Sequence, residues 1–184
     1  MTTTIKPNER RHVIPYERAR TRVRWPMIFE LEPVDASFMD RAHNKMDVHR
    51  DYDSTPERVH SGFLGFVGDP PWSPGFVGLD WWTEPRRLDD AVMDELYSFM
   101  AMRVHVIEHT PGARTVAYVS RWSLPLATRM VQIIETDRLP SGKTRLRYRV
   151  AYDPPRAFRH FVGPVQHGFH RWFEASLRGL ARYV

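Results

Sequence analysis

The sequence of 184 residues predicts an α+β fold with a curved antiparallel sheet around one long helix. Three observations predict it. The C-terminal run has helical periodicity, the segments between residues 77 and 152 alternate apolar and polar residues, and a capped helix signal follows a first alternating segment. We therefore expect about six to seven strands wrapped around a long C-terminal helix, with short helices after the first strand.

The C-terminal segment 153–184 is predicted to form the long helix. Its apolar residues recur in steps of three and four, which places them on one helical face. Gly163 and Pro164 interrupt this pattern. A proline inside a helix removes a backbone hydrogen bond and clashes with the preceding turn. We therefore expect a kink or a new start near Val162 and a main helix from Pro164 to Tyr183.

The first strand is predicted at Met46–Asp53, and the spacing of Ser54 and Glu57 in Ser-Thr-Pro-Glu is that of a capping box at the start of a short helix. Residues 94–97 fit a helical turn or the start of a strand. Turn sequences at Thr110–Ala113 and Leu139–Lys143 separate strands. The later strands are expected at residues 77–83, from about 97 to 109, 115–122, 129–136 and 145–152.

The two faces of the predicted strands differ in chemistry. In the strand 145–152, Tyr148 and Tyr152 alternate with arginines, so we expect the arginine face to meet solvent. In the strand 115–122, Tyr118 and Ser120 share a face with Trp122. We expect these aromatic faces to point toward the C-terminal helix.

The order of these elements, the capped segment 54–59, the loop around Trp72, the hairpin at Pro111-Gly112 and the aromatic C-terminal helix resemble the START-like (SRPBCC) helix-grip superfamily. Within it the chain is similar to the polyketide cyclase/dehydrase and lipid-transport branch. The resemblance covers about residues 45–184. It divides the chain into a basic N-terminal extension, 1–43, partly disordered or packed on the body, and a helix-grip ligand-binding domain, 44–184.

The resemblance implies a cavity between the concave sheet and the C-terminal helix, which binds a hydrophobic molecule such as a lipid, a sterol or an aromatic polyketide. Rings with a few hydroxyl and indole donors are typical linings of small-molecule sites. The same rings could also simply fill the core. The expected ligand contacts are Trp72, Tyr118, Trp122, Tyr148, Tyr152, Phe161, Phe169 and Phe173.

Several polar clusters were weighed as sites of chemistry, and no catalytic residue is assigned. His167, His170 and Glu174 would share one helical side, but without an HExxH arrangement they favour a surface cluster over a metal site. The alternating aspartates 47, 51 and 53 lack a calcium-loop pattern and indicate a wet strand face. His105 and His109 share a strand face and could act as acid or base. We predict no metal and no cofactor.

Composition and charge limit the chemistry, the partners and the cellular location that we expect for this protein. The chain has no cysteine, which excludes disulfides and thiol chemistry. Its net charge of +5 comes from the first 24 residues, which carry seven basic and two acidic residues. No signature of sequence-specific nucleic-acid binding accompanies this arm. No apolar core follows the charges of the first residues, so we expect no signal peptide and a cytoplasmic protein.

Three function hypotheses follow. The first is binding or transport of a hydrophobic small molecule by the cavity. The second is a cyclase or dehydrase type of enzyme that uses tyrosine, histidine or arginine in the pocket. The third is a membrane-surface or partner-binding protein that makes weak contacts with anionic surfaces through residues 1–24. The first two differ in one feature: an enzyme brings titratable side chains together deep in its cavity. The oligomeric state is left open.

Overall fold

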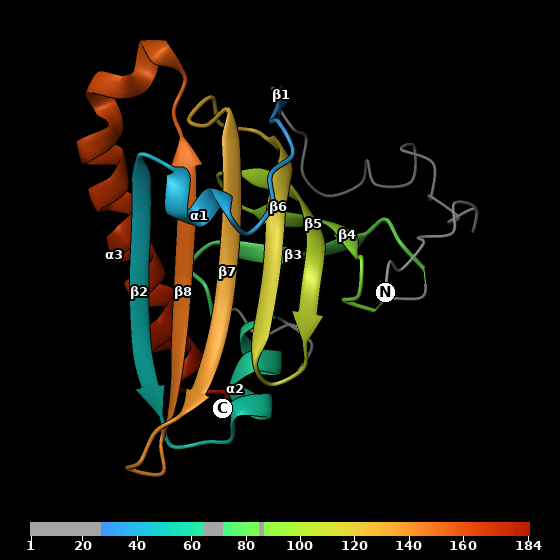
Figure 1. Ribbon diagram of the computed structural model, residues 1–184, viewed down its shortest axis with the longest axis vertical. Helices are drawn as coiled ribbons and strands as arrows, with labels where there is room; N and C mark the ends of the chain where they lie inside the picture. Colours follow the sequence, from blue (N-terminus) through green and yellow to red (C-terminus); the bar gives the residue numbers. More distant parts are fainter. Residues whose placement is uncertain (1–26, 65–71, 85–86) are drawn as a thin grey trace, which may run out of the picture.

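The fold is an antiparallel sheet with a long helix along its concave side (Figure 1). The computed structural model describes residues 27–64, 72–84 and 87–184. The strand order is β2-β8-β7-β6-β5-β4-β3, and β1 pairs with β6. The strands are β1 (Phe29–Glu30), β2 (Asn44–Tyr52), β3 (Phe76–Trp81), β4 (Val92–Tyr97), β5 (Ala101–Thr110), β6 (Arg114–Trp122), β7 (Arg129–Arg138) and β8 (Thr144–Asp153).

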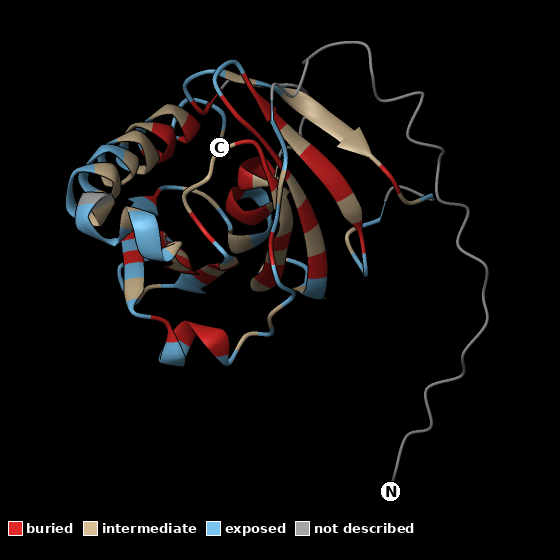
Figure 2. Ribbon diagram, turned by 90° about the horizontal axis from the view of Figure 1, so that it is seen from above, coloured by how far each residue is buried: buried red, intermediate tan, exposed pale blue. Residues whose placement is uncertain are grey.

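The helices complete the α+β architecture that the sequence predicts. They are α1 (Phe38–Arg41), α2 (Pro56–Phe63), the 3₁₀ helix η2 (Arg156–Phe161) and α3 (Val162–Leu180). Figure 1 shows β3 and β4 crossing behind the longer strands, with α3 standing beside β2. Buried residues, red in Figure 2, lie mainly along the strands. No helix in the described ranges is long and apolar enough to cross a bilayer.

The C-terminal half of α3 is anchored to the rest of the fold. Leu177 and Leu180 are fully buried, and the hydroxyl of Tyr52 in β2 donates to the carbonyl of Leu177 at 2.8 Å. The hydroxyls of Ser73 and Ser176 lie 2.9 Å apart. Gly179 meets the backbone of Trp72 so closely that a Cβ at this position would overlap the Trp72 carbonyl oxygen. This end of α3 therefore fixes where Trp72 sits.

The start of α3 confirms the predicted new start near Val162. The 3₁₀ turn η2 ends at Phe161, and the α-helix begins at Val162, so Pro164 lies in its first turn. At that position the missing N–H of proline leaves no hydrogen bond unmade. The helix ends at Leu180, three residues before the predicted end.

Two local predictions require correction. The N-cap of α2 is Thr55, whose side chain accepts from the N–H of Arg58 at 3.3 Å, and not Ser54. The strand expected from about Tyr97 begins only at Ala101, as β5, and the residues before it, where a helical turn was possible, form the separate strand β4, joined to β5 through residues 98–100. The periodicity was ambiguous there because β4 carries acidic residues on both of its faces, Asp94 on one and Glu95 on the other.

The bulge between β5 and β6 changes which residues of β6 face inward. Val104 pairs with Val119 and Met102 pairs with Trp122, so one extra residue of β6 lies between these pairs. An extra residue moves the following side chains to the other face of a sheet. Ala117 and Trp122 therefore both face inward, although they lie five residues apart, and the predicted shared face of Tyr118, Ser120 and Trp122 is wrong.

The convex face of the sheet is covered partly by the N-terminal extension and partly by ion pairs. Phe38, Met39 and Ala42 of α1 and its flank are buried against Val116, Val131, Ile133 and Ala151. The predicted arginine face of β8 lies on this side: Arg145 donates to Asp51 at 2.7 Å, and Arg147 pairs with Asp47. Both aspartates belong to the β2 face that was predicted to be wet.

We expect Gly179→Ala to lower the free energy of unfolding by about 1–3 kcal/mol, because the added methyl group pushes α3 away from Trp72. Gly168→Ala, on the same helix, is the matched control: its Cβ meets nothing within 4 Å, and it should stabilise the protein by up to about 1 kcal/mol. Urea denaturation measures both. Equal effects of the two substitutions would contradict the described close contact.

Candidate functional site

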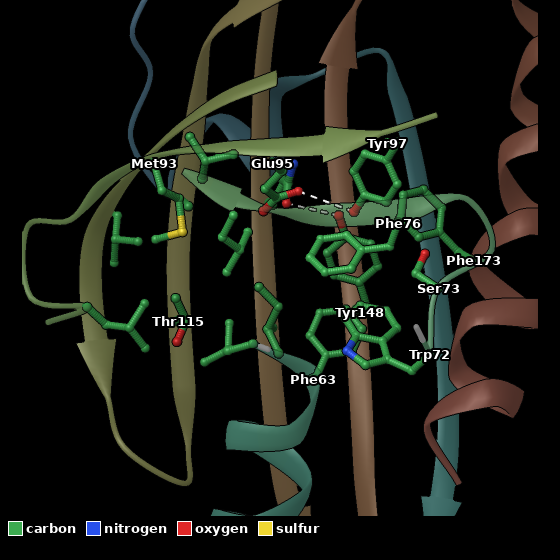
Figure 3. A pocket seen from close by; sticks show the side chains of 18 of the residues that line it. Phe63, Trp72, Ser73, Phe76, Met93, Glu95, Tyr97, Thr115, Tyr148 and Phe173 are labelled. Carbon is green, nitrogen blue, oxygen red and sulfur yellow. Dashed lines mark hydrogen bonds between the residues drawn. The ribbon is translucent and has the colours of Figure 1, made fainter. Parts of the chain in front are cut away.

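The space between the sheet and α3 contains two adjoining chambers. The first encloses about 700 Å³ between atoms, including the part open to solvent, although little of it is wide enough for a water molecule because side chains project into it. It lies between α2, the Trp72 segment, strands β3 to β8 and α3 (Figure 3). A ligand in this chamber therefore has to displace side chains.

The second chamber encloses about 470 Å³, again including its opening, and lies nearer the start of α3. Its lining is almost wholly apolar and includes Met46, Met100, Met102 and Met130. Gln132, Tyr148 and Phe173 line both chambers. The hydroxyl of Tyr148 donates to Oε1 of Gln132 at 3.0 Å, so this hydrogen-bonded pair helps divide the two spaces.

Seven aromatic residues of the first chamber form a closed series of ring contacts, which we call the aromatic belt. Each ring lies 4.6–6.2 Å from the next, centroid to centroid. Tilted, edge-on and stacked pairs all occur, and such pairs contribute beyond the area that they bury. In order the belt runs Phe63, Trp72, Phe76, Tyr97, Trp172, Phe173, Tyr148 and back to Phe63.

Glu95 is the one carboxyl among the described residues that line the first chamber. The alternation of β4 places Met93, Glu95 and Tyr97 on its inner face, while Asp94 points to the other face. The hydroxyl of Tyr97 donates to Oε2 of Glu95 at 3.4 Å, a long hydrogen bond, which Figure 3 shows as a dashed line. The carboxyl is therefore held at the edge of the aromatic belt.

These surroundings shift the pKa values of all three ionisable residues of the first chamber. Burial raises the pKa of Glu95 from its ordinary 4.5 to about 7, although the hydrogen bond from Tyr97 acts in the opposite direction. Burial and then the charge of Glu95 raise the pKa values of Tyr97 and Tyr148 well above their usual range. At neutral pH both tyrosines keep their protons, and Glu95 lies close to the midpoint of its titration.

Three buried donors that line the chambers have no hydrogen-bond partner within the described ranges. They are Nε1 of Trp72 in the first chamber, and Nε1 of Trp122 and the hydroxyl of Tyr152 in the second. Each of these residues is at most 8% exposed. Because buried donors usually have a partner, these three groups are available to donate to acceptor atoms that enter the chambers, whether of water or of a bound molecule.

The structure brings six of the eight predicted ligand contacts to the chambers. Trp72 lines the first, Tyr148 and Phe173 line both, and Trp122, Tyr152 and Phe169 line the second. Tyr118 lies on the other face of β6, where its ring stacks on His105 at 4.7 Å, so its prediction as a cavity residue is corrected. The side chain of Phe161 lies outside the part of the chain that is described.

Sequence reasoning missed Glu95 and Tyr97. The signal that could have found them is the alternation of Met93, Glu95 and Tyr97, which places one carboxyl on an otherwise apolar strand face. It was hidden because the preceding residue, Asp94, is also acidic, is buried on the opposite face and pairs with Arg103 at 2.8 Å. Two successive acidic residues break the alternation of apolar and polar residues by which a strand is recognised in a sequence.

The predicted histidines make structural contacts. Nε2 of His105 lies 2.8 Å from the hydroxyl of Ser120. Nδ1 of His109 lies 2.9 Å from the hydroxyl of Thr115, which also lies 3.2 Å from Nε2 of the buried His60. Nδ1 of His60 accepts from the N–H of Gly112, so this group ties α2 to the β5–β6 hairpin. Burial lowers the pKa of His60 to about 4.

The candidate metal ligands for which contacts are described form pairs and not a larger cluster. Nδ1 of His170 lies 3.7 Å from Glu174 on the exposed side of α3. Asp53 pairs with Lys143 at 3.3 Å, and Asp47 and Asp51 pair with arginines of β8. Within the described ranges, no group of three or more histidine, aspartate or glutamate side chains is placed to hold a metal ion.

Comparison with known proteins shows the fold. No protein-family model and no curated protein matches the chain. Protein CV1439 from Chromobacterium violaceum is 23% identical with a TM-score of 0.56, over 77% of this chain and 97% of that one. The Zhui aromatase/cyclase from Streptomyces sp. R1128 is 10% identical with a TM-score of 0.60, over 75% of this chain and 91% of that one.

The di-domain aromatase/cyclase BexL, from the BE-7585A biosynthetic pathway, is a third similar structure. It is 14% identical with a TM-score of 0.61, over 76% of this chain and 46% of that one. At such identities the likeness concerns the fold alone. The helix-grip fold expected from the sequence is thereby confirmed.

We expect the stability of the wild-type protein to fall relative to that of Glu95→Gln as pH rises. The folded pKa of Glu95 lies near 7 and the unfolded value near 4.5, so folding retains a proton between these values and stability is lost through that window. The difference in unfolding free energy between the two proteins should grow by about 2–3 kcal/mol from pH 4.5 to pH 8.

Urea denaturation at both pH values measures this difference. Glu174→Gln, at an exposed position on α3, is the control for loss of a carboxylate at the surface. A constant difference between wild type and Glu95→Gln across the range would show that Glu95 is solvated in the folded protein.

Proposed function

We propose that this protein binds a hydrophobic small molecule, with rings or a flat apolar body, in the two chambers between the sheet and α3. The observation that carries the proposal is the combination of the aromatic belt with three buried donors that lack partners within the described ranges. Apolar walls provide the binding energy, and the few donors orient the ligand. The similar structures named as aromatase/cyclases support a ligand of this general kind.

Binding has to move side chains, because the chambers are narrow as they stand. Two rings of α3 are well placed to move, because Phe169 and Phe173 are only partly buried, in contrast to Leu177 and Leu180. Trp172 is held more firmly, since its Nε1 donates to the carbonyl of Pro74 at 2.9 Å. The C-terminal half of α3 is fixed to β2 and to the Trp72 segment. The half that begins at Val162 forms part of the wall of the second chamber. We propose that ligand enters on that side, where Val165, Gln166 and Phe169 line the space.

Ala117→Phe tests this function directly. Ala117 is buried on the inner face of β6 and lines the first chamber, so a phenyl ring there fills space that a ligand needs. We expect it to weaken binding of the neutral fluorescent probe N-phenylnaphthylamine by on the order of tenfold or more. Fluorescence titration measures the affinity, and thermal unfolding confirms that the variant folds.

Tyr118→Ala is the matched control, because Tyr118 is the next residue and lies on the other face of the strand. It should leave probe binding unchanged. Failure of the wild-type protein to bind the probe, or equal binding by wild type and Ala117→Phe, would contradict the proposed site. A loss confined to Tyr118→Ala would restore the original assignment of the strand faces.

A second candidate function is acid–base catalysis of the cyclase or dehydrase type, favoured by the position of Glu95 beside Tyr97. Three titratable side chains, Glu95, Tyr97 and Tyr148, meet in the first chamber, as expected of an enzyme of this type. The carboxylate of Glu95 could take a proton from carbon beside a carbonyl group, while the hydroxyl of Tyr97 donates a hydrogen bond to the carbonyl oxygen.

Exchange of the acidic C–H protons of β-tetralone in D₂O, followed by NMR, tests this second function. Wild-type protein should accelerate exchange, and Glu95→Gln should remove about 100-fold of that acceleration. Tyr97→Phe should have a smaller effect, since it removes a donor but not the base. Exchange at the rate of buffer alone would rule out this use of Glu95 and leave the binding function in place.

A further inference from the structure

The charge of Glu95 has no positive partner in the cavity. No lysine, arginine or histidine lines either chamber within the described ranges. The nearest arginine in the strand register is Arg103 of β5, and it is engaged on the opposite face: it donates to Asp94 at 2.8 Å, and its guanidinium lies 3.9 Å from the ring centre of Trp82. For a carboxyl that is partly buried among apolar side chains, ionisation without a neighbouring cation is costly.

The groups that face Glu95 offer no second charge. Tyr97 on the same strand and Tyr148 from β8 are its titratable neighbours, and both remain neutral near pH 7. Met102 of β5 and Leu79 of β3 are its strand partners, and both are apolar. Gln132 from β7 contributes an amide, and Trp172 and Phe173 from α3 contribute rings.

The aromatic belt provides a second, independent attraction for positive charge. The face of an aromatic ring is electronegative and attracts ammonium groups at distances up to about 6 Å. Tyr97 belongs to the belt and also hydrogen-bonds Glu95, so the carboxyl and the rings border one space. A cation there would lie beside both a carboxylate and aromatic rings.

Other ligand charges fit the chamber less well. A carboxylate or phosphate head group would be repelled by ionised Glu95 and would find no basic residue among the described lining. A neutral hydroxyl could form a hydrogen bond with the carboxyl, but it would gain nothing from the attraction of aromatic rings for positive charge. The apolar remainder of the first chamber and the methionine-rich second chamber require a hydrophobic body on the same molecule.

We propose that the ligand is a hydrophobic organic cation, an amine or quaternary ammonium group on a ring-bearing body, with its charge between Glu95 and the aromatic belt. This inference rests on the proposed function and specifies its ligand class. The second chamber then receives the apolar body, where Trp122 and Tyr152 donate to acceptor atoms such as carbonyl or ether oxygens.

The proposal predicts a definite dependence on pH. A bound cation favours the ionised form of Glu95, so below pH 7 binding has to expel the proton and the affinity is lower. Affinity for a cation should therefore rise from pH 6 to pH 8 and then level off. A neutral ligand should show the opposite preference or none.

Phenyltrimethylammonium and its neutral isostere tert-butylbenzene form the test pair, because the first keeps its charge at every pH. Isothermal titration calorimetry with full-length protein should show that the cation binds on the order of tenfold more tightly than the isostere at pH 8. This preference should shrink at pH 6. Glu95→Gln should abolish the preference and keep binding of tert-butylbenzene, and Glu174→Gln should retain the preference.

The outcomes separate the inference from the function on which it rests. Binding of tert-butylbenzene that equals or exceeds that of the cation at pH 8 would overturn the cation proposal and leave the hydrophobic site standing. Binding of neither molecule would overturn both. If Glu95→Gln does not fold, the pH profile of the wild-type protein still decides, since affinity for the permanent cation that does not rise from pH 6 to pH 8 contradicts the proposal.

Discussion

The contact between α3 and the Trp72 segment is the constraint on which the cavity depends. Gly179 lets the helix backbone approach the Trp72 carbonyl, Ser176 meets Ser73, and the carbonyl of Leu177 accepts from Tyr52. A side chain at Gly179 would push the helix away from the Trp72 segment. Because these contacts fix only the last turns, the rings nearer the start of α3 can line open space instead of closing the core.

The cavity combines two environments that oppose each other energetically. Apolar rings favour a neutral Glu95, and its pKa of about 7 reflects the cost of ionising the carboxyl among them. The same rings, with their electronegative faces, favour a cation that would ionise Glu95 again. One carboxyl can thus serve the binding of a charged ligand or the transfer of a proton. The proposed functions differ in what occupies the chamber and share the geometry of the site.

Much of the fold could be predicted from sequence where one face of an element is apolar and the other is charged. β8 is such a strand, with Tyr148 inward and Arg147 outward, and α3 is such a helix. Prediction failed where this contrast is lost. β4 has acidic residues on both faces, and the bulge in β6 lets Ala117 and Trp122 face the same side. Glu95, the central residue of the candidate site, lies on the strand that the sequence pattern hid.

The most direct measurement is an NMR titration of the Glu95 carboxyl carbon in protein labelled with ¹³C, assigned by its loss in Glu95→Gln. The account predicts a midpoint near pH 7 in the free protein and a downward shift when phenyltrimethylammonium saturates the site. A midpoint near the ordinary value of 4.5 would show that the carboxyl is solvated. That result would remove the basis for both a buried acid–base group and a cation site.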